Sequence, residues 1–220
     1  MKQTVAIDLD DTVAKTADYI ARALAAHSVC KVVDPAQWPS YNLCETYTDL
    51  DTASVCTILR KEVPYSSLEL TSNLWPYVVA SIRKHGFTPM FVTSRAQIWG
   101  GDRDSAHADT YAWLKKVGIA VEPSELTVLD LKTTKATHLQ MLGHKVVASI
   151  DDNLREVDEY RKVFPGGFHC LSAGPFNRKV RDAQTGNILP PTYLVYSQGV
   201  GLFNQDLHRY LTRISFRSDR

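Results

Sequence analysis

The chain has 220 residues, of which 44% are hydrophobic and 22% are charged, a composition that is typical of a folded globular protein and excludes a disordered or collagen-like chain. Lysine and arginine total 25 against 24 aspartates and glutamates, which gives a formal net charge of +1. No global field therefore draws the protein to nucleic acid or to a membrane surface, and a nucleic-acid partner would need a local basic patch.

Two further features bear on where the protein resides. No apolar run approaches the roughly 18 residues that a bilayer-spanning helix needs, and the N-terminus lacks the basic start and small-residue cleavage site of a signal peptide. We therefore expect a cytoplasmic protein with no membrane partner. The four cysteines lack CxxC spacing and are expected to be reduced packing residues rather than a disulfide framework or a zinc site.

Short apolar runs alternate with helix-like stretches along the chain, and this order predicts an α/β fold with a mainly parallel sheet flanked by helices. Strands are expected at 4–9, 89–93, 126–129, 146–150, 168–171 and 192–197, and helices at 74–85, 104–117, 133–142, 154–164 and 204–214. Gly86 and Gly118 directly follow two of these helices, where a residue able to take a positive φ often ends a helix. A turn is expected at 184–187.

The stretch from about residue 15 to residue 70 differs from the rest. It has helical spacing at 17–27 and 53–61, separated by chain breakers such as Asp34-Pro35 and Trp38-Pro39. A crossover between parallel strands needs only about a dozen residues. The surplus therefore predicts an inserted helical subdomain at 15–70, between the two parts of a core domain at 1–14 and 71–220.

The end of the first strand carries three aspartates in the string Asp8-Leu9-Asp10-Asp11-Thr12. Alternation along the strand sends Asp8 and Asp10 to one side, at the carboxyl end where parallel sheets bind ligands, while Leu9 points into the packing. Two carboxylates in one small volume raise each other's pKa unless a cation relieves them, and a divalent metal commonly does so. A helix-capping cluster without chemistry is the alternative.

A second acidic pair, Asp151-Asp152, follows the strand at 146–150 in the same way. If the two strands are neighbours, both pairs converge on one crevice. The set offers only oxygen ligands, which suits Mg²⁺. The alternative is that Asp151-Asp152 cap the helix that begins near Leu154.

Polar and basic residues complete the set of motifs. Thr93, Ser94 and Arg95 stand at the end of the second strand in chain order. There a hydroxyl, backbone N–H groups and a guanidinium could hold a phosphate, although a simple turn is the alternative. Lys132 and Lys135 stand at the start of a helix, where a cation opposes the helix dipole. That unfavourable placement suggests a functional role for one of them.

In this order, the four motifs resemble those of the haloacid dehalogenase superfamily of phosphatases, over about residues 2–173. The resemblance implies a Rossmann-like parallel sheet flanked by helices, with a small helical cap inserted after the first strand. True dehalogenases lack the second aspartate of the first motif, so Asp10 points to a phosphate substrate.

The resemblance also implies roles for single residues. Asp8 would be the nucleophile that takes the phosphoryl group, and Asp10 would protonate the leaving group and then activate water. Lys135 would neutralise the charge of the aspartate and the phosphate, with Lys132 as the alternative. Phosphate would be bound by Thr93, Ser94, Arg95 and Lys132, and Mg²⁺ by Asp8, Asp10, Asp151 and Asp152.

The layout further resembles the 5′(3′)-deoxyribonucleotidases, through the helical cap, Thr93-Ser94, the string Tyr111-Ala112-Trp113 and the paired aspartate. The implied substrate is a small phosphomonoester such as a deoxynucleoside monophosphate. In the cap, Trp38, Tyr41 and Tyr47 either stack on a base or fill a core.

Two departures leave alternatives open. Thr110 stands where the mammalian deoxyribonucleotidases carry a lysine, and Arg95 stands in place of their proline. Arg95 makes the second motif closer to that of the polynucleotide 3′-phosphatases. A nucleic-acid partner would then be held by one basic face made of Arg95, Arg103, Arg178, Lys179 and Arg181. A non-catalytic binding protein with the same fold is the remaining alternative.

Overall fold

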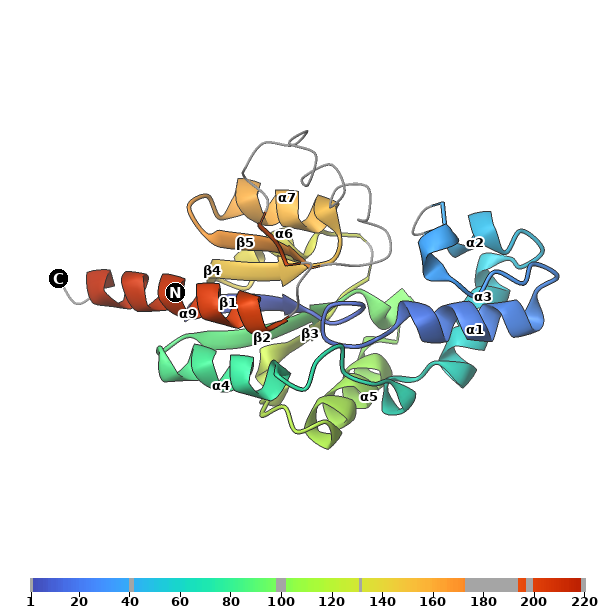
Figure 1. Cartoon of the computed structure of the whole chain (residues 1–220), viewed down its shortest axis with the longest axis horizontal. Helices are drawn as coiled ribbons and strands as arrows, with labels where there is room; N and C mark the ends of the chain where they lie inside the picture. The colour runs from blue at the N-terminus through green and yellow to red at the C-terminus, as the bar shows by residue number, and fades with distance from the viewer. Residues whose placement is uncertain are drawn as a thin grey trace.

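The computed structural model of the protein describes residues 2–39, 42–97, 102–130, 132–172, 194–196 and 200–218. Within them, strands form one parallel sheet with helices on both faces, and a helical segment projects from one end (Figure 1). The predicted α/β class is therefore confirmed. The expected turn at 184–187 lies outside the described residues.

Six strands lie in the order β3-β2-β1-β4-β5-β6, and each neighbouring pair is parallel. They are β1 (Lys2–Asp8), β2 (Thr88–Thr93), β3 (Leu126–Val128), β4 (His144–Asp151), β5 (Phe168–Ser172) and β6 (Leu194–Tyr196). Ile7 of β1 is in register with Phe91 on one side and Ile150 on the other. The carboxyl ends of β1, β2 and β4 therefore meet at one edge of the sheet.

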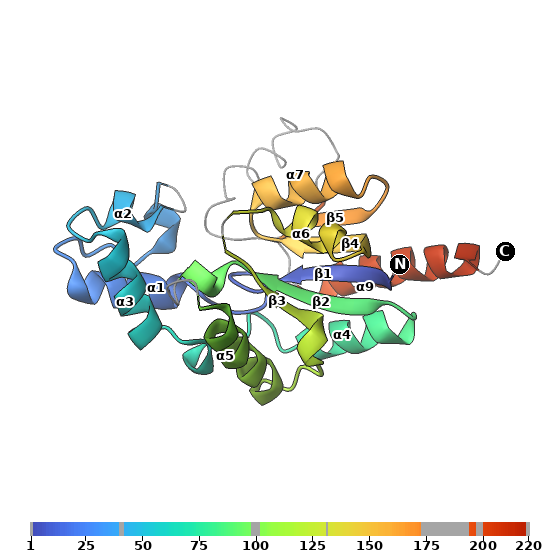
Figure 2. The same ribbon diagram turned by 180° about the vertical axis from the view of Figure 1, so that it is seen from behind.

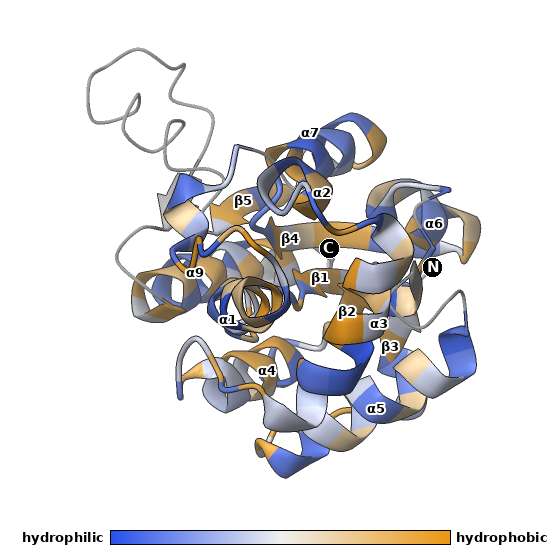
Figure 3. Cartoon of the chain, turned by 90° about the vertical axis from the view of Figure 1, so that its right-hand side faces the viewer, coloured by the Kyte–Doolittle hydropathy of each residue, from blue (hydrophilic) through white to orange (hydrophobic). Residues whose placement is uncertain are grey.

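The helices that cover the sheet are α4 (Trp75–Lys84), α5 (Arg103–Lys116), α6 (Lys135–Met141), α7 (Leu154–Val163) and α9 (Val200–Ser218). Helices α6 and α7 lie on one face, while α4, α5 and α9 lie on the other. Figure 3 shows the hydrophobic strands between these two layers, whose outer sides are hydrophilic. Gly86 and Gly118 end α4 and α5 with φ values of 81° and 80°, as predicted.

Alternating side chains of β1 supply two cores. Val5 and Ile7 belong to the larger cluster, which includes residues of α4 and α9. Ala6 points the other way, into a cluster with Leu139 of α6 and Tyr160 of α7. Burial on both faces explains why the strands read as continuous apolar runs rather than as an alternating pattern.

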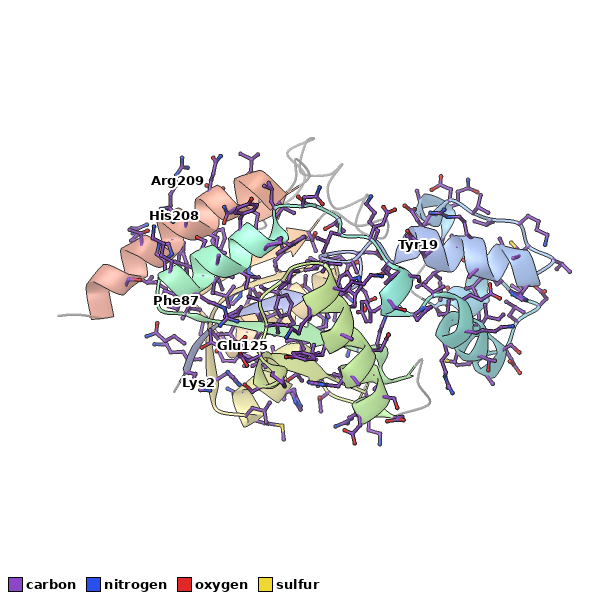
Figure 4. The ribbon with its side chains drawn as sticks, turned by 90° about the horizontal axis from the view of Figure 1, so that it is seen from below. Lys2, Tyr19, Phe87, Glu125, His208 and Arg209 are labelled. Atoms are coloured by element: carbon purple, nitrogen blue, oxygen red, sulfur yellow. The ribbon has the colours of Figure 1, made fainter. Side chains whose placement is uncertain are left out.

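The segment at 15–70 contains α1 (Ala17–His27), α2 (Leu43–Thr46) and α3 (Thr52–Glu62). It lies beyond the carboxyl ends of the strands, apart from the sheet (Figures 1 and 2). In Figure 4, Tyr19 of α1 marks this end of the molecule, and His208 and Arg209 of α9 mark the opposite end. We call residues 15–70 the inserted segment.

The chain leaves and re-enters the core at neighbouring points. Ala14 and Leu70 form an antiparallel bridge. The backbone N–H of Lys15 donates to the carbonyl of Glu69 at 2.9 Å, and that of Thr71 donates to the carbonyl of Val13 at 2.8 Å. The inserted segment is therefore joined to the core through two hydrogen-bonded crossings.

Some elements differ from the predicted ones. The one-turn helix α2 follows the expected chain breakers at residues for which no helix was predicted, and the Asn42 side chain accepts from the backbone N–H of Cys44 at its start. Helix α9 exceeds the expected range 204–214 at both ends. Short 3₁₀ turns span Pro35–Gln37, Tyr65–Ser67, Arg95–Gln97 and Pro123–Glu125.

None of the helices described here is long and apolar enough to cross a membrane.

Candidate active site

Three buried carboxylates meet at the carboxyl edge of the sheet. Asp8 is the last residue of β1, Asp151 is the last residue of β4, and Asp152 follows it. One oxygen from each lies within 4.8 Å of the others. Asp8 therefore meets the second acidic pair because β1 and β4 are hydrogen-bonded neighbours.

Lys135 lies between two of these carboxylates. It is the first residue of α6, and its Nζ donates to Oδ1 of Asp8 at 2.5 Å and to Oδ2 of Asp151 at 2.8 Å. Burial alone would lower the pKa of Lys135, but the two carboxylates outweigh burial and hold that pKa well above its ordinary value. By contrast, Lys132 is exposed, and its backbone N–H donates to Asp130.

The three carboxyl groups at this edge can carry more negative charge than the single positive charge of Lys135 neutralises. Burial raises the pKa of Asp8 well above its ordinary value even though Lys135 opposes that effect, and burial followed by the Asp8 charge raises the pKa of Asp152. Among the described residues, Oδ2 of Asp8 is buried without a hydrogen-bond partner. Three converging carboxylates with an orphaned oxygen are a donor set that fits Mg²⁺.

Asp10 has different surroundings. Its Oδ1 accepts from Arg95 Nε at 2.9 Å and from Thr16 Oγ1 at 3.0 Å, and its Oδ2 accepts from Tyr65 and Thr93, each at 2.9 Å. Burial raises the pKa of Asp10, but Arg95 and these hydrogen bonds outweigh burial and lower it overall. Both oxygens of Asp10 are thus fixed by hydrogen bonds, and its predicted roles as proton donor and metal ligand stay predictions.

Arg95 is buried, with a side chain that is 3% exposed. Besides its ion pair with Asp10, it donates through Nη1 to the carbonyl of Val63 at 3.2 Å, and its guanidinium lies 3.8 Å from the centre of the Tyr65 ring. Thr93 and Arg95, both predicted to bind phosphate, are thus turned toward Asp10, and Ser94 lines the pocket described below.

The capping alternative applies to neighbouring residues. Asp11, whose φ is 56°, accepts through Oδ1 from the backbone N–H groups of Thr16 and Ala17, at 3.0 and 2.7 Å. It therefore caps α1, and burial raises its pKa to about 6. At α7 the cap is Asn153 rather than the aspartate pair, since its side chain accepts from the N–H of Arg155.

A pocket of about 630 Å³ opens over the carboxylates, a volume that suits a small organic ligand. The core supplies its polar side, including Asp8, Lys135 and Asp152. The inserted segment supplies an opposing side that is mostly apolar, and every described side chain that it contributes is uncharged: Thr16, Ile20, Trp38, Asn42, Leu43, Cys44, Thr52, Val55, Cys56 and Leu59.

Of the three aromatic residues singled out in the inserted segment, Trp38 lines the pocket. Tyr47 is fully buried and donates its hydroxyl to the carbonyl of Val32 at 2.6 Å, so it fills a core. Tyr41 lies outside the described residues.

Tyr65 and Glu156 are site residues that the sequence analysis missed. Tyr65 reaches Asp10 across 55 positions of the chain, and Glu156 of α7 accepts from the backbone N–H of Lys135 at 2.9 Å. Neither belongs to a short motif, and only folding brings them to the site.

The basic face that the polynucleotide alternative needs is not assembled by the described residues. Arg95 is buried against Asp10, and Arg103 pairs with Asp130 at 2.5 Å. The other three residues of that set, Arg178, Lys179 and Arg181, lie outside the described residues.

Comparison with known proteins identifies the architecture. No protein-family profile and no curated protein sequence matches this chain. Among solved structures, a predicted phosphatase from Clostridium acetobutylicum is 15% identical, with a TM-score of 0.55 over 97% of this chain and 99% of its own. A protein described as a haloacid dehalogenase-like hydrolase from Bacteroides fragilis is 12% identical, with a TM-score of 0.56 over 89% and 97% of the two chains.

A third structure, described as a haloacid dehalogenase-like hydrolase from Burkholderia xenovorans, is 11% identical, with a TM-score of 0.51 over 90% of this chain and 95% of its own. The chain has the haloacid dehalogenase fold. Within this fold, the motifs of the sequence fall at the end of β1, the end of β2, the start of α6 and the end of β4. The resemblance stated from the sequence is thus confirmed for the fold.

Proposed function

We propose that the protein is a Mg²⁺-dependent phosphomonoester hydrolase that forms an aspartyl-phosphate on Asp8. The arrangement of Asp8 carries this proposal. One of its oxygens is fixed by Lys135, the other is buried without a partner among the described residues, and the residue lines a pocket of small-molecule size. A carboxylate held in this way is a positioned nucleophile, and Lys135 offsets the repulsion between it and an anionic phosphate.

The residues that would hold Mg²⁺ are Asp8, Asp151 and Asp152. When bound, the ion would supply positive charge that screens the carboxylate and the phosphate from each other. Lys135 contributes on the same edge of the sheet, because its contacts keep it protonated and aimed at Asp8 and Asp151.

The proposed reaction has two steps. In the first, an oxygen of Asp8 bonds to phosphorus as the bond to the leaving oxygen breaks, and that oxygen takes a proton from the protonated form of Asp10, which the negative charge of the bound phosphate favours. In the second, Asp10 takes a proton from water, whose oxygen bonds to phosphorus and releases inorganic phosphate from Asp8. Asp10 thereby regains its proton, and Asp8 regains its carboxylate.

The pocket favours a small substrate with an uncharged leaving group, as in a deoxynucleoside monophosphate. The side of the pocket that faces the carboxylates is mostly apolar and carries no charged side chain among the described residues of the inserted segment. We assign this segment, residues 15–70, as a cap over a core made of residues 1–14 and 71–220. Such a cap excludes bulk solvent from the site and limits the size of the substrate.

Phosphate release tests this proposal. We expect the purified protein to release phosphate from p-nitrophenyl phosphate and from deoxynucleoside monophosphates with Mg²⁺, and not with EDTA. Asp8→Asn should abolish turnover while retaining the fold, as checked by circular dichroism. Full activity of Asp8→Asn would exclude Asp8 as the nucleophile, and wild-type protein without metal-dependent release would favour a binding role instead.

A panel of substrates tests the specificity. We expect nucleoside 5′- and 3′-monophosphates to be hydrolysed faster than a 3′-phosphorylated oligonucleotide, because the cap limits access to the carboxylates. The opposite ranking would favour a polynucleotide 3′-phosphatase, and preference for a sugar phosphate would contradict the nucleotide assignment alone.

A further inference from the structure

Asp10 is held by side chains from two separate parts of the chain. Arg95, just after β2, contacts Oδ1, and Tyr65, at the exit of the inserted segment, contacts Oδ2. Thr16 is a second donor to Oδ1 and Thr93 a second donor to Oδ2, so the carboxylate is fixed both in position and in the orientation of its plane.

Tyr65 is itself rigidly placed. It is fully buried, its backbone N–H donates to Asp109 of α5 at 3.0 Å, and its ring lies 5.1 Å from that of Trp113. Arg95 lies over the same ring and also bonds the carbonyl of Val63. The two side chains therefore form one buried unit that is anchored on α5 and on the last turn of the inserted segment.

We propose that Tyr65 and Arg95 are positioning residues, which place Asp10 for proton transfer between Asp10 and the leaving oxygen. This inference rests on the proposed function, in which Asp10 protonates that oxygen as its bond to phosphorus breaks. A general acid acts only within hydrogen-bond reach of the atom that it protonates. A displaced Asp10 would therefore accelerate the departure of the leaving group less. Tyr65 has no part in the sequence motifs, and its contribution is read from these contacts alone.

The dependence of the rate on the leaving group separates this role from general damage to the fold. p-Nitrophenolate departs readily without a proton, whereas the alkoxide of a nucleoside needs one. The ratio kcat/KM reports on the steps up to the first irreversible bond cleavage, so it isolates leaving-group departure from hydrolysis of the intermediate. Loss of correct placement should therefore lower kcat/KM for alkyl phosphates much more than for p-nitrophenyl phosphate.

The decisive variant is Tyr65→Phe, which removes the hydroxyl and keeps the ring that packs on Trp113 and Arg95. Its matched control is Tyr210→Phe, which removes a hydroxyl of α9 that donates to the carbonyl of Gly166 at 3.2 Å and does not line the pocket. We expect Tyr65→Phe to lower kcat/KM for a deoxynucleoside 5′-monophosphate by about tenfold, a part of the 10²–10⁴-fold that a general acid supplies, and for p-nitrophenyl phosphate by less than about threefold. Tyr210→Phe should alter both values in equal proportion.

Arg95→Lys is the second variant, because it keeps the positive charge and loses the planar fork that bonds both Asp10 and Val63. It should show the same selective loss on alkyl phosphates. An equal loss on both substrates in Tyr65→Phe and Arg95→Lys, or no loss in either, would overturn the inference. If the wild-type protein hydrolyses neither substrate with Mg²⁺, the proposed function itself fails, so the two failures are distinguishable.

Discussion

At the residue scale, two lysines three positions apart have opposite surroundings. Lys132 is exposed, whereas Lys135 is buried between Asp8 and Asp151. In the sequence, both lysines stand at the start of a predicted helix, where the helix dipole makes a positive charge unfavourable. Only the contacts in the fold show that Lys135 has the compensating carboxylates.

This contrast predicts the effects of two substitutions. Lys135→Ala should lower kcat for any phosphomonoester by about 10²-fold or more, because it removes a fixed positive charge from beside Asp8. Lys132→Ala, as the matched control, should stay within about twofold of the wild type. Steady-state kinetics with saturating Mg²⁺ measures both, and a larger loss in Lys132→Ala would transfer the catalytic role to Lys132.

The residues at the site differ in how far the sequence could predict them. Asp8 and Asp151 end neighbouring strands, so a local string plus the parallel sheet was enough to bring them together. Arg95 was expected at a phosphate and instead pairs with Asp10, because its direction depends on Val63 and Tyr65. Those two residues belong to a segment that is distant in sequence, and no linear pattern reports such contacts.

At the element scale, the strands were predictable because burial on both faces gives short apolar runs. The order of the strands was not predictable, since it depends on packing between distant segments.

Within β5, His169 bonds Ser149 of β4 through Nδ1 at 2.8 Å and the carbonyl of Phe164 through Nε2 at 2.9 Å. Burial lowers the pKa of His169 below its ordinary value.

These contacts of His169 predict a dependence of stability on pH. The folded protein keeps His169 neutral at a pH where the unfolded chain is protonated, so the unfolded state binds more protons. The free energy of unfolding should therefore fall as the pH drops below about 6.5. Between pH 7 and pH 5, Tm should fall less in His169→Gln than in the wild type. The control His208→Gln alters an exposed histidine of α9 and should retain the wild-type slope; an unchanged slope in His169→Gln would contradict the prediction.

At the scale of the whole molecule, the three carboxylates are contributed by strands at the centre of the sheet. Their like charges destabilise the metal-free fold, because burial gives each charge little solvent to screen it. A cation that binds only the folded state stabilises it by mass action.

Metal binding should therefore be measurable without turnover. Mg²⁺ at 100 times its Kd should add about 2.7 kcal/mol to the free energy of unfolding, which corresponds to about 5–10 °C in Tm for a chain of this size. Differential scanning calorimetry measures the shift. Asp152→Asn should reduce it strongly, while Asp104→Asn, an exposed position on α5, should leave it intact. An equal shift in both variants would place the ion elsewhere.

The bridge between Ala14 and Leu70 also bears on how such an architecture can be remodelled. Because these two residues already lie side by side, a tight turn could replace everything between them without stretching the central strand. The remaining sheet would keep Asp8, Lys135 and Asp151, yet it would lose Thr16 and Tyr65, and with them two of the four donors to Asp10. A shortened descendant would thus retain its nucleophile, while its proton donor would be fixed by Thr93 and Arg95 alone.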